Sequence, residues 1–261
     1  MSKNLFNTYS RYYDLLYRDK DYAGETGHIK RLLKRHGITQ GNLLEFGSGT
    51  GKHGRLLAAA GYPVHGIERS ADMAALAKQG NGFTCESGDI RTAHVGRRFN
   101  AVFSLFHVIS YQTTNTSLHA VFARAAEHLK PGGLFLFDFW YSPAVYAQQP
   151  SVRVKRMADK HIKIVRLAEP VIHTSENRVD VHYTLFATDR NTGTVQTLQA
   201  THPMRHFSLP ELDLLAEAHG FIPGWRWSAS RRRSGRGPPG PSSTRPRART
   251  APRSDRSCRG T

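Results

Sequence analysis

The chain has 261 residues, of which 39% are hydrophobic, enough to fold as one large domain or one domain with a sizeable insertion. No stretch approaches the roughly 18 uninterrupted apolar residues of a membrane helix, and the start lacks the apolar run of a signal peptide, so we expect a cytoplasmic protein without a membrane partner. The two cysteines exclude a disulfide framework, and no metal site is predicted because neither His nor Cys shows ligand spacing.

The net charge of +17 is concentrated at one end of the chain. Residues 226–261 hold eleven arginines against one acid and contribute +10, which leaves +7 for the other 225 residues. Residues 230–261 have too few apolar side chains to fold and are predicted to be a disordered Arg/Pro-rich tail. Two interpretations stay open: a basic arm that contacts nucleic acid nonspecifically, and, favoured by the composition, GC-rich DNA translated out of frame.

Residues 1–150 alternate helix-like and strand-like patterns after an opening segment rich in tyrosine. Such alternation is typical of a doubly wound α/β sheet with parallel strands. In chain order, the pattern predicts a helix around 29–36, a strand at 43–46, a helix around 56–60, a strand at 64–68, a helix capped by Ser70, a strand at 99–105, a helix at 118–129 ended by Pro131-Gly132-Gly133, and a buried strand at 134–139.

The pattern changes to polar–apolar alternation between residues 151 and 206, for example at Val179 and Val181. Asp189–Gly193 has the composition of a hairpin turn, so an antiparallel sheet is predicted here, added to the core. Residues 207–229 are predicted to return to the core with a helix and a strand, and Ser208 and Glu211 form the capping box that opens this helix.

A glycine-rich segment, Glu45-Phe46-Gly47-Ser48-Gly49-Thr50-Gly51, lies between a predicted strand and a predicted helix. Alternating glycines let the backbone turn tightly and approach a ligand, and the next helix offers free N–H groups. Glu68 ends the following strand, where a carboxylate can accept hydrogen bonds from two ribose hydroxyls. Asp89 on a later loop can accept from an adenine amino group, and Ile90 can pack against the ring.

A nicotinamide-dependent dehydrogenase is an alternative, because Gly49-x-Gly51-x-x-Gly54 also fits the dinucleotide fingerprint. That fingerprint alone is weak. Glu45 favours a cofactor with a cationic amino-acid group, since an acid two residues before the first glycine is awkward beside a pyrophosphate.

These motifs resemble those of class I S-adenosylmethionine-dependent methyltransferases, over about residues 1–225. The matching residues, in the order and spacing of that family, are Glu45 to Gly51, Glu68, Asp89-Ile90 and Leu129-Lys130-Pro131-Gly132-Gly133. The opening segment, Tyr9 to Tyr17 with Lys20-Asp21-Tyr22, is similar to small-molecule methyltransferases that modify sugars, including nucleotide-linked amino sugars.

The resemblance implies S-adenosylmethionine as cofactor and a Rossmann-like seven-strand sheet with an antiparallel β insertion after the fifth strand. It divides the chain into a core with an N-terminal lid (1–150), an acceptor-side insertion (151–206), a return helix and strand (207–229) and the tail (230–261). It places Gly47 and Gly49 under the methionine part. The expected cofactor-binding residues are Tyr13, Tyr17, Glu45, Phe46, Gly47, Ser48, Gly49, Gly51, Glu68, Arg69, Asp89, Ile90, Leu105 and Phe106.

Candidate residues for the transfer step follow the fourth and fifth predicted strands, at the carboxyl ends where such folds bind ligands. His107 is the first choice for general base, and Asp138 is expected either to orient the acceptor or to brace the loop. Tyr13 is expected to contact the sulfonium or to pack on the core. The expected acceptor-binding residues are His107, Tyr111, Trp140, Tyr141 and Arg205, the last either for an anionic group such as a phosphate or as a solvated surface residue.

The predicted reaction is methyl transfer to an amine or hydroxyl of a small molecule, with a nucleotide-linked sugar as one candidate. RNA or protein methylation is an alternative, although the Asn/Asp-Pro-Pro-Tyr/Phe loop used on planar nitrogen is absent after the fourth strand. A basic nucleic-acid-binding protein is the alternative from another class. Either a monomer or a homodimer is expected.

Overall fold

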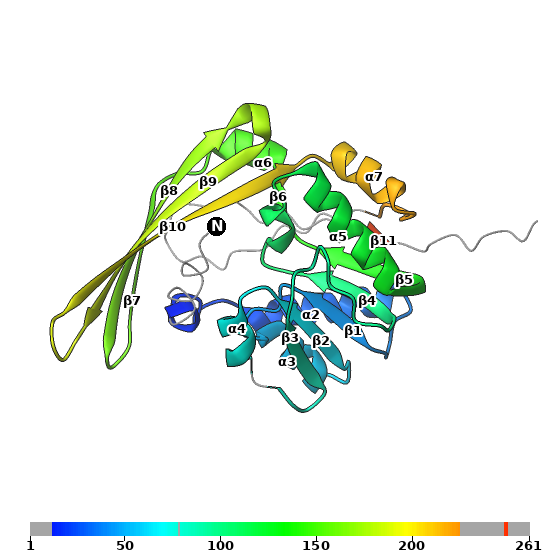
Figure 1. Cartoon of the computed structure of the whole chain (residues 1–261), viewed down its shortest axis with the longest axis horizontal. Coiled ribbons are helices and arrows are strands. Elements are labelled where there is room, and N and C mark those ends of the chain that lie inside the picture. Colours follow the sequence, from blue (N-terminus) through cyan, green and yellow to red (C-terminus); the bar gives the residue numbers. More distant parts are fainter. Residues whose placement is uncertain (1–11, 78, 225–247, 250–261) are drawn as a thin grey trace, which may run out of the picture.

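The computed structural model describes residues 12–77, 79–224 and 248–249, which form two sheets covered in part by helices (Figure 1). Within these ranges, no helix combines the length and the hydropathy needed to cross a bilayer. Figure 1 shows the two sheets side by side, one flanked by helices and one extending as long hairpins away from it.

The first sheet has the strand order β11-β5-β4-β1-β2-β3, and β1 to β5 are parallel. An α/β fold with a parallel central sheet is therefore confirmed. The order reverses between β1 and β4, so the loops after these two strands open at the switch point where ligands bind in such sheets. The parallel strands are β1 (Leu43–Phe46), β2 (Val64–Glu68), β3 (Phe83–Ser87), β4 (Phe99–Ser104) and β5 (Leu129–Phe137).

Helices cover both faces of this sheet because neighbouring residues on a strand point to opposite sides. Leu43 and Leu44 are both fully buried, but Leu43 packs with one set of helices and Leu44 with the other. The helices on the Leu43 side are α2 (Tyr22–Arg35), α3 (Lys52–Ala59) and α4 (Ala71–Leu76). Those on the Leu44 side are α5 (Asn115–His128) and α7 (Leu209–Ala218).

Local signals fixed most element ends. The strands predicted at 43–46 and 64–68 are β1 and β2, and the side chains of Ser70 and Ser208 cap α4 and α7 as expected. One boundary differs: α5 ends at His128, before the Pro131–Gly133 turn, and this turn lies within β5. The chain becomes extended at Leu129 because that residue already pairs with Phe99 on β4.

The second sheet has the order β6-β10-β9-β8-β7, and its four long strands pair antiparallel. Its short strand β6 runs parallel to β10. The face turned toward the rest of the molecule buries apolar side chains such as Ile164, Val179 and Leu185. The elements are β6 (Trp140–Tyr141), α6 (Ser142–Gln148), β7 (Arg153–Ala158), β8 (Ile162–His173), β9 (Arg178–Asp189) and β10 (Val195–Phe207).

Two details of the predicted fold need correction. In the described part of the chain the first sheet has five parallel strands and one antiparallel strand, which falls short of seven. The added strand, β11 (Ala248–Arg249), lies in the segment predicted to contain no strand, and it pairs with Phe135 and Leu134 of β5. An edge strand presents unpaired backbone N–H and C=O groups, which any extended segment can pair with regardless of its side chains. The remaining tail positions and residues 225–229 lie outside the described residues.

Candidate functional site

The glycine-rich loop after β1 has a backbone conformation that disfavours residues with a side chain at its glycine positions. Gly47, Gly49 and Gly51 have φ of +74°, +56° and +75°. A Cβ atom on Gly47 would lie 2.6 Å from Val108, and one on Gly51 would lie 2.6 Å from the Phe83 ring. A Cβ on Gly49 would meet its nearest neighbour only at 3.9 Å. Among the described residues, the loop is thus crowded at Gly47 and Gly51 and makes only an ordinary van der Waals contact at Gly49.

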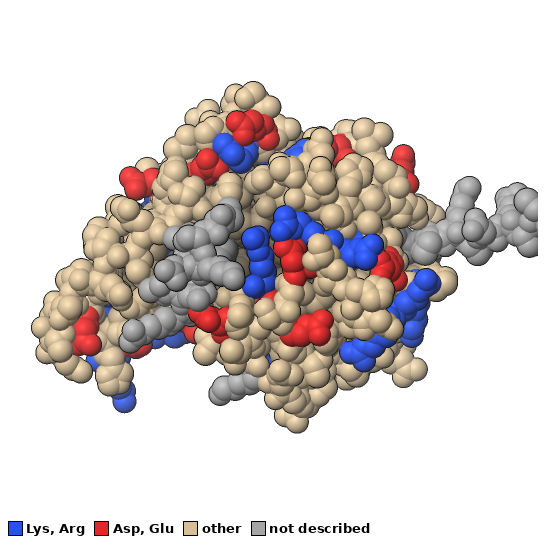
Figure 2. Space-filling view, in the orientation of Figure 1, with Lys and Arg blue, Asp and Glu red and all other residues tan. Residues whose placement is uncertain are grey.

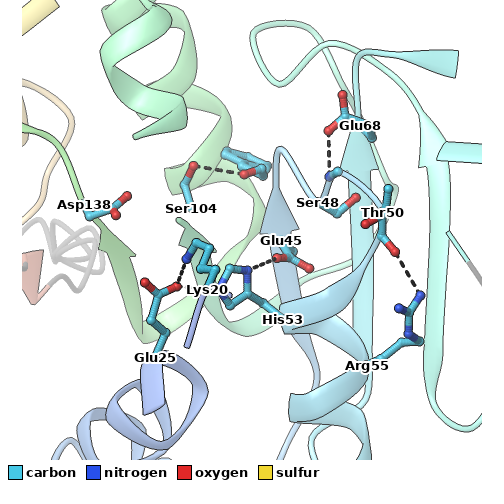
Figure 3. Close-up of polar contacts among 12 residues, drawn as sticks. Lys20, Glu25, Glu45, Ser48, Thr50, His53, Arg55, Glu68, Ser104 and Asp138 are labelled. Atoms are coloured by element: carbon cyan, nitrogen blue, oxygen red, sulfur yellow. Dashed lines mark hydrogen bonds and ion pairs between the residues drawn. The ribbon is translucent and has the colours of Figure 1, made fainter. Parts of the chain in front are cut away.

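The carboxylate of Glu68, at the end of β2, holds this loop in place (Figure 3). Its Oε2 accepts from the backbone N–H of Gly49 at 2.8 Å, and its Oε1 accepts from the N–H of Ser70 at 2.8 Å. Burial raises the pKa of Glu68, while these backbone hydrogen bonds oppose the rise. Each carboxylate oxygen keeps a second lone pair, so Glu68 can still accept hydrogen bonds from a diol.

Glu45 is a buried acid directly beneath the loop. It is 1% exposed, and burial, reinforced by the neighbouring charge of Glu68, raises the pKa of Glu45 well above its usual value. Among the residues that the structure describes, its Oε2 has no hydrogen-bond partner, and its Oε1 lies 3.9 Å from Nδ1 of His53 (Figure 3). A cation placed beside such a carboxyl would favour its ionised form.

A chain of polar contacts joins the region before α2 to the glycine loop. His53 on α3 lies 2.7 Å from Glu25, which in turn pairs with Lys20 (Figure 3). The ammonium of Lys20 lies 4.7 Å from the centre of the Phe106 ring. The pKa of His53 is lowered, chiefly by burial. These contacts were not foreseen, because they join segments that only the tertiary fold brings together.

Aromatic side chains of the N-terminal segment gather beside the loop that follows β4. The rings of Tyr13 and Tyr17 lie 4.7 Å apart, and the Tyr17 ring meets Phe106 edge-on at 4.9 Å. The same segment reaches the glycine loop, where Asp14 pairs with Lys52 at 2.8 Å. The structure therefore brings together three of the aromatic residues that the sequence singled out.

The loop after β4 carries two adjacent residues in left-handed backbone. Phe106 and His107 have φ of +67° and +62°, which costs on the order of 1–3 kcal/mol per residue and is typical of functional sites. Asp138, buried at the end of β5, stabilises this conformation, because its Oδ1 accepts from the backbone N–H of His107 at 2.8 Å. Its Oδ2 lies 3.6 Å from Nδ1 of His107, and the Trp140 ring lies 6.3 Å from the imidazole.

Tyr111 connects this loop to the second sheet. Its hydroxyl lies 2.6 Å from Nδ1 of His202 on β10, and it sits at the end of the short helix η1 (Val108–Tyr111). Burial raises the pKa of Tyr111 well above its usual value and lowers the pKa of His202 to about 4, the latter with help from Arg166. Both side chains are consequently neutral near pH 7, and the hydrogen bond is between uncharged partners.

Asp89 follows β3 and is already engaged by a neighbour. Its Oδ1 accepts from the backbone N–H of Arg91 at 3.0 Å and from Nε of Arg91 at 2.9 Å. The Arg91 side chain is the main reason that the pKa of Asp89 is lowered. Arg69 lies farther away, with Nε 3.9 Å from the carboxylate. Ile90 is buried in the core on the Leu44 side of the sheet.

Other predicted site residues contribute less to this group. The guanidinium of Arg205 donates to Glu211 at 2.6 Å and to Asn115 at 2.8 Å, so it braces β10 against the start of α7 and α5. Tyr141 packs against the core, and the side chains of Phe46 and Leu105 are buried within it. Over residues 12–77, 79–224 and 248–249, no three His, Cys, Asp or Glu side chains are grouped so as to hold a metal ion.

Comparison with known proteins gives a family match at this part of the chain. The model of a methyltransferase domain matches residues 43–133, which begin at β1 and include the glycine-rich loop. The chain is 34% identical over 177 residues to dTDP-3-amino-3,4,6-trideoxy-alpha-D-glucopyranose N,N-dimethyltransferase of Streptomyces venezuelae, which covers 66% of this chain and 74% of the relative.

A second relative and a solved structure cover more of the chain. dTDP-3-amino-3,6-dideoxy-alpha-D-glucopyranose N,N-dimethyltransferase of Streptomyces fradiae is 29% identical over 219 residues, covering 81% of this chain and 84% of the relative. The crystal structure of DesVI from Streptomyces venezuelae superposes with a TM-score of 0.79 at 26% identity, covering 93% of this chain and 98% of that one. The similarity therefore extends over both sheets.

Proposed function

The chain belongs to the class I S-adenosylmethionine-dependent methyltransferases, and from that premise we propose that it methylates the amino group of a nucleotide-linked sugar. This choice of acceptor is supported by the agreement between two relatives. Both Streptomyces enzymes named above are N,N-dimethyltransferases of dTDP-amino sugars. The dehydrogenase and DNA- or RNA-binding alternatives have no such support.

The glycine loop fits the cofactor on two observations. Among the described residues, an added Cβ on Gly49 would meet nothing closer than 3.9 Å, and Glu45 is a buried acid whose raised pKa is opposed only by a backbone hydrogen bond from Gly54 and the charge of Arg55. We assign the methionine ammonium to Glu45, the ribose hydroxyls to Glu68 and the adenine to Asp89 and Ile90. When bound, the cofactor supplies a methyl group that is activated by the positive charge on its sulfur.

His107 and Asp138 handle the proton of the acceptor. An amine attacks through its lone pair and carries a surplus proton once the new N–C bond has formed, so a base must take that proton. His107 is placed for this role, because Asp138 fixes its backbone and lies 3.6 Å from its Nδ1. General-base catalysis of this kind contributes roughly 10²–10⁴-fold.

The aromatic group around Tyr17 excludes water from the transfer step. Tyr13, Tyr17 and Phe106 pack ring to ring beside the loop that carries His107. The faces of such rings attract a sulfonium cation. This aromatic group would hold the sulfonium of the bound cofactor beside the loop that carries His107, and it would contact the acceptor on the side of the second sheet.

The test is methyl transfer from labelled S-adenosylmethionine to a dTDP-3-amino sugar, followed by mass spectrometry. We expect one and then two methyl groups on nitrogen, and none on the matched sugar that carries a hydroxyl in place of the amine. Binding of S-adenosylhomocysteine combined with methylation of the hydroxyl sugar alone would overturn the amine assignment. Methylation of RNA or peptide with the sugars left untouched would overturn the acceptor class.

A further inference from the structure

Three basic side chains occupy neighbouring positions on the inner face of the second sheet. On β7, Arg153 and Lys155 alternate with the exposed residues Val154 and Arg156, and they share their face with the buried Met157. On β8, Arg166 lies directly opposite Lys155 in the antiparallel register. The basic triad, as we call Arg153, Lys155 and Arg166, therefore faces inward, toward the N-terminal segment.

The register makes this arrangement costly for the fold. Like charges directly opposite each other on antiparallel strands destabilise a sheet. Here they are also half-buried, and burial together with the charge of Arg166 lowers the pKa of Lys155. Asp19 on the N-terminal segment opposes this effect only in part, being the smallest of the three influences on Lys155. An anion bound between these cations would relieve the repulsion.

Aromatic rings link the basic triad to the transfer site. Arg166 lies 4.9 Å over the Tyr183 ring, and its Nη1 donates to the hydroxyl of Tyr17 at 3.2 Å. Tyr17 in turn contacts Phe106, the residue before His107. Lys155 Nζ lies 5.7 Å from the Tyr17 ring. Lys155 also donates to the backbone carbonyl of Leu16, so Tyr17 and its segment connect the basic triad to the residue that precedes His107.

We infer that the basic triad binds the diphosphate of a nucleoside-diphosphate sugar and thereby sets the position of the sugar ring against His107. This inference rests on the proposed function. In such a substrate one sugar ring separates the amine from the diphosphate, and here Tyr17 and Phe106 connect the cations to the loop that carries His107. Arginine binds phosphate through two parallel N–H groups, and lysine adds a point charge.

A nucleic-acid backbone carries the same phosphate chemistry but requires an extended basic surface. On the face drawn in Figure 2, basic side chains of the described residues are interspersed with acidic ones and form no continuous stripe. Three cations on one sheet face are enough to neutralise a diphosphate but not an extended backbone. The geometry therefore favours a nucleoside diphosphate over nucleic acid.

The experiment measures the affinity of the full chain for dTDP and for thymidine by calorimetry. We expect dTDP to bind much more tightly than thymidine, and Arg166→Gln and Lys155→Gln each to weaken dTDP about 10–100-fold, as expected for loss of a charge-assisted hydrogen bond. Arg166→Lys should lose less than Arg166→Gln. The matched control is Arg156→Gln, on the exposed face of the same strand, which should leave dTDP affinity unchanged.

Affinity for S-adenosylhomocysteine, measured on every variant, separates the possible failures. Weaker dTDP binding with unchanged cofactor affinity in the Gln variants supports the inference. Unchanged dTDP affinity in both Gln variants overturns it. Equal binding of dTDP and thymidine by the wild type also overturns it. Binding of single-stranded DNA that is lost with the same substitutions, while dTDP does not bind, would assign the basic triad to nucleic acid instead. If the wild type binds dTDP through the basic triad but transfers no methyl group to amino sugars, the proposed function is refuted while the triad remains a diphosphate site.

Discussion

The two halves of the site hold ionisable side chains of opposite type, buried acids beside the parallel sheet and bases on the second sheet. On the parallel sheet, the acids Glu45 and Glu68 lie on the two strands beside the glycine loop, and Arg55 donates to the Thr50 carbonyl of that loop. On the second sheet, the basic triad of Arg153, Lys155 and Arg166 faces the same region. A sulfonium cofactor with an ammonium group is cationic, and a nucleoside-diphosphate acceptor is anionic. From this difference we infer that each half selects one of the two substrates by charge, so that neither substrate competes for the place of the other.

The two halves also differ in how they are held. The cofactor half relies on backbone: left-handed glycines and N–H groups fixed by Glu68, which leave little freedom before a ligand arrives. The acceptor half relies on long side chains such as Lys155 and Arg166, which are held by contacts with the N-terminal segment, at the Leu16 carbonyl and the Tyr17 hydroxyl. We therefore expect cofactor binding to the first half to be independent of the acceptor, and the second half to determine which acceptor is methylated.

The largest expected effect comes from blocking the cofactor half alone. Gly49→Arg fills the open space above the loop and should abolish binding of S-adenosylhomocysteine in calorimetry, while dTDP binding persists. The control is Gly193→Arg at a hairpin tip, which has the same left-handed backbone, with φ of +72°, and no atom within 4 Å of an added Cβ. Retention of cofactor affinity by Gly49→Arg would remove the loop from the site.

The next effect tests the point where the halves meet. His107→Ala should lower kcat by about 10²–10⁴-fold, the usual contribution of a general base, with unchanged affinity for S-adenosylhomocysteine and dTDP. His161→Ala, at an exposed turn of the second sheet, is the control. Steady-state kinetics with a dTDP-amino sugar provide the measurement, and full activity of the variant would exclude His107 as the base.

Acidic pH should lower the stability of the protein through His202, whose side chain contacts Tyr111 between the two sheets. Burial lowers the pKa of His202 from 6.5 to about 4. Between these two pH values the unfolded chain binds a proton at His202 and the folded chain does not, so the free energy of unfolding falls as the pH drops from 6.5 toward 4. The contribution reaches at most about 3 kcal/mol. Urea unfolding of the wild type and of His202→Gln should diverge over this pH range, with the variant losing less. Parallel curves would show that His202 is not held neutral in the folded protein.

The smallest effect has opposite signs for stability and binding. Burial raises the pKa of Glu45, so its folding contribution is greatest at acidic pH and is lost as the pH rises from about 4 through the raised folded-state value. Glu45→Gln should therefore raise the melting temperature of the cofactor-free protein at pH 7 and weaken S-adenosylhomocysteine about tenfold, a loss of about 1.4 kcal/mol. Glu86→Gln on β3 is the control, and lower stability of Glu45→Gln would contradict the account.

The elements around the glycine loop could be predicted because their signals are local. The glycine spacing, the acid at the end of β2 and the serine caps of α4 and α7 all act over a few residues. The acceptor half was predicted only as an antiparallel sheet, since its chemistry depends on register. Lys155 and Arg166 become neighbours only when the β7–β8 hairpin closes.

Contacts between distant segments could not be predicted from one sequence. Tyr111 and His202 are 91 residues apart, and no pattern links them. Arg205 was expected either to bind an anionic group or to be a solvated surface residue, whereas its guanidinium donates to Glu211 and Asn115. Ala248–Arg249 pair with β5 through the backbone, and side-chain composition gives no signal for such a pairing. In each case the deciding partner is set by the tertiary fold.

A crystal structure of the protein with S-adenosylhomocysteine and dTDP tests the central claim most directly. The account predicts the adenosyl group on Gly47–Gly51 with its ribose on Glu68, and the diphosphate against Lys155 and Arg166. Nucleotide diphosphate seated on the glycine loop, or phosphates remote from the second sheet, would contradict the division of the site into an acidic and a basic half.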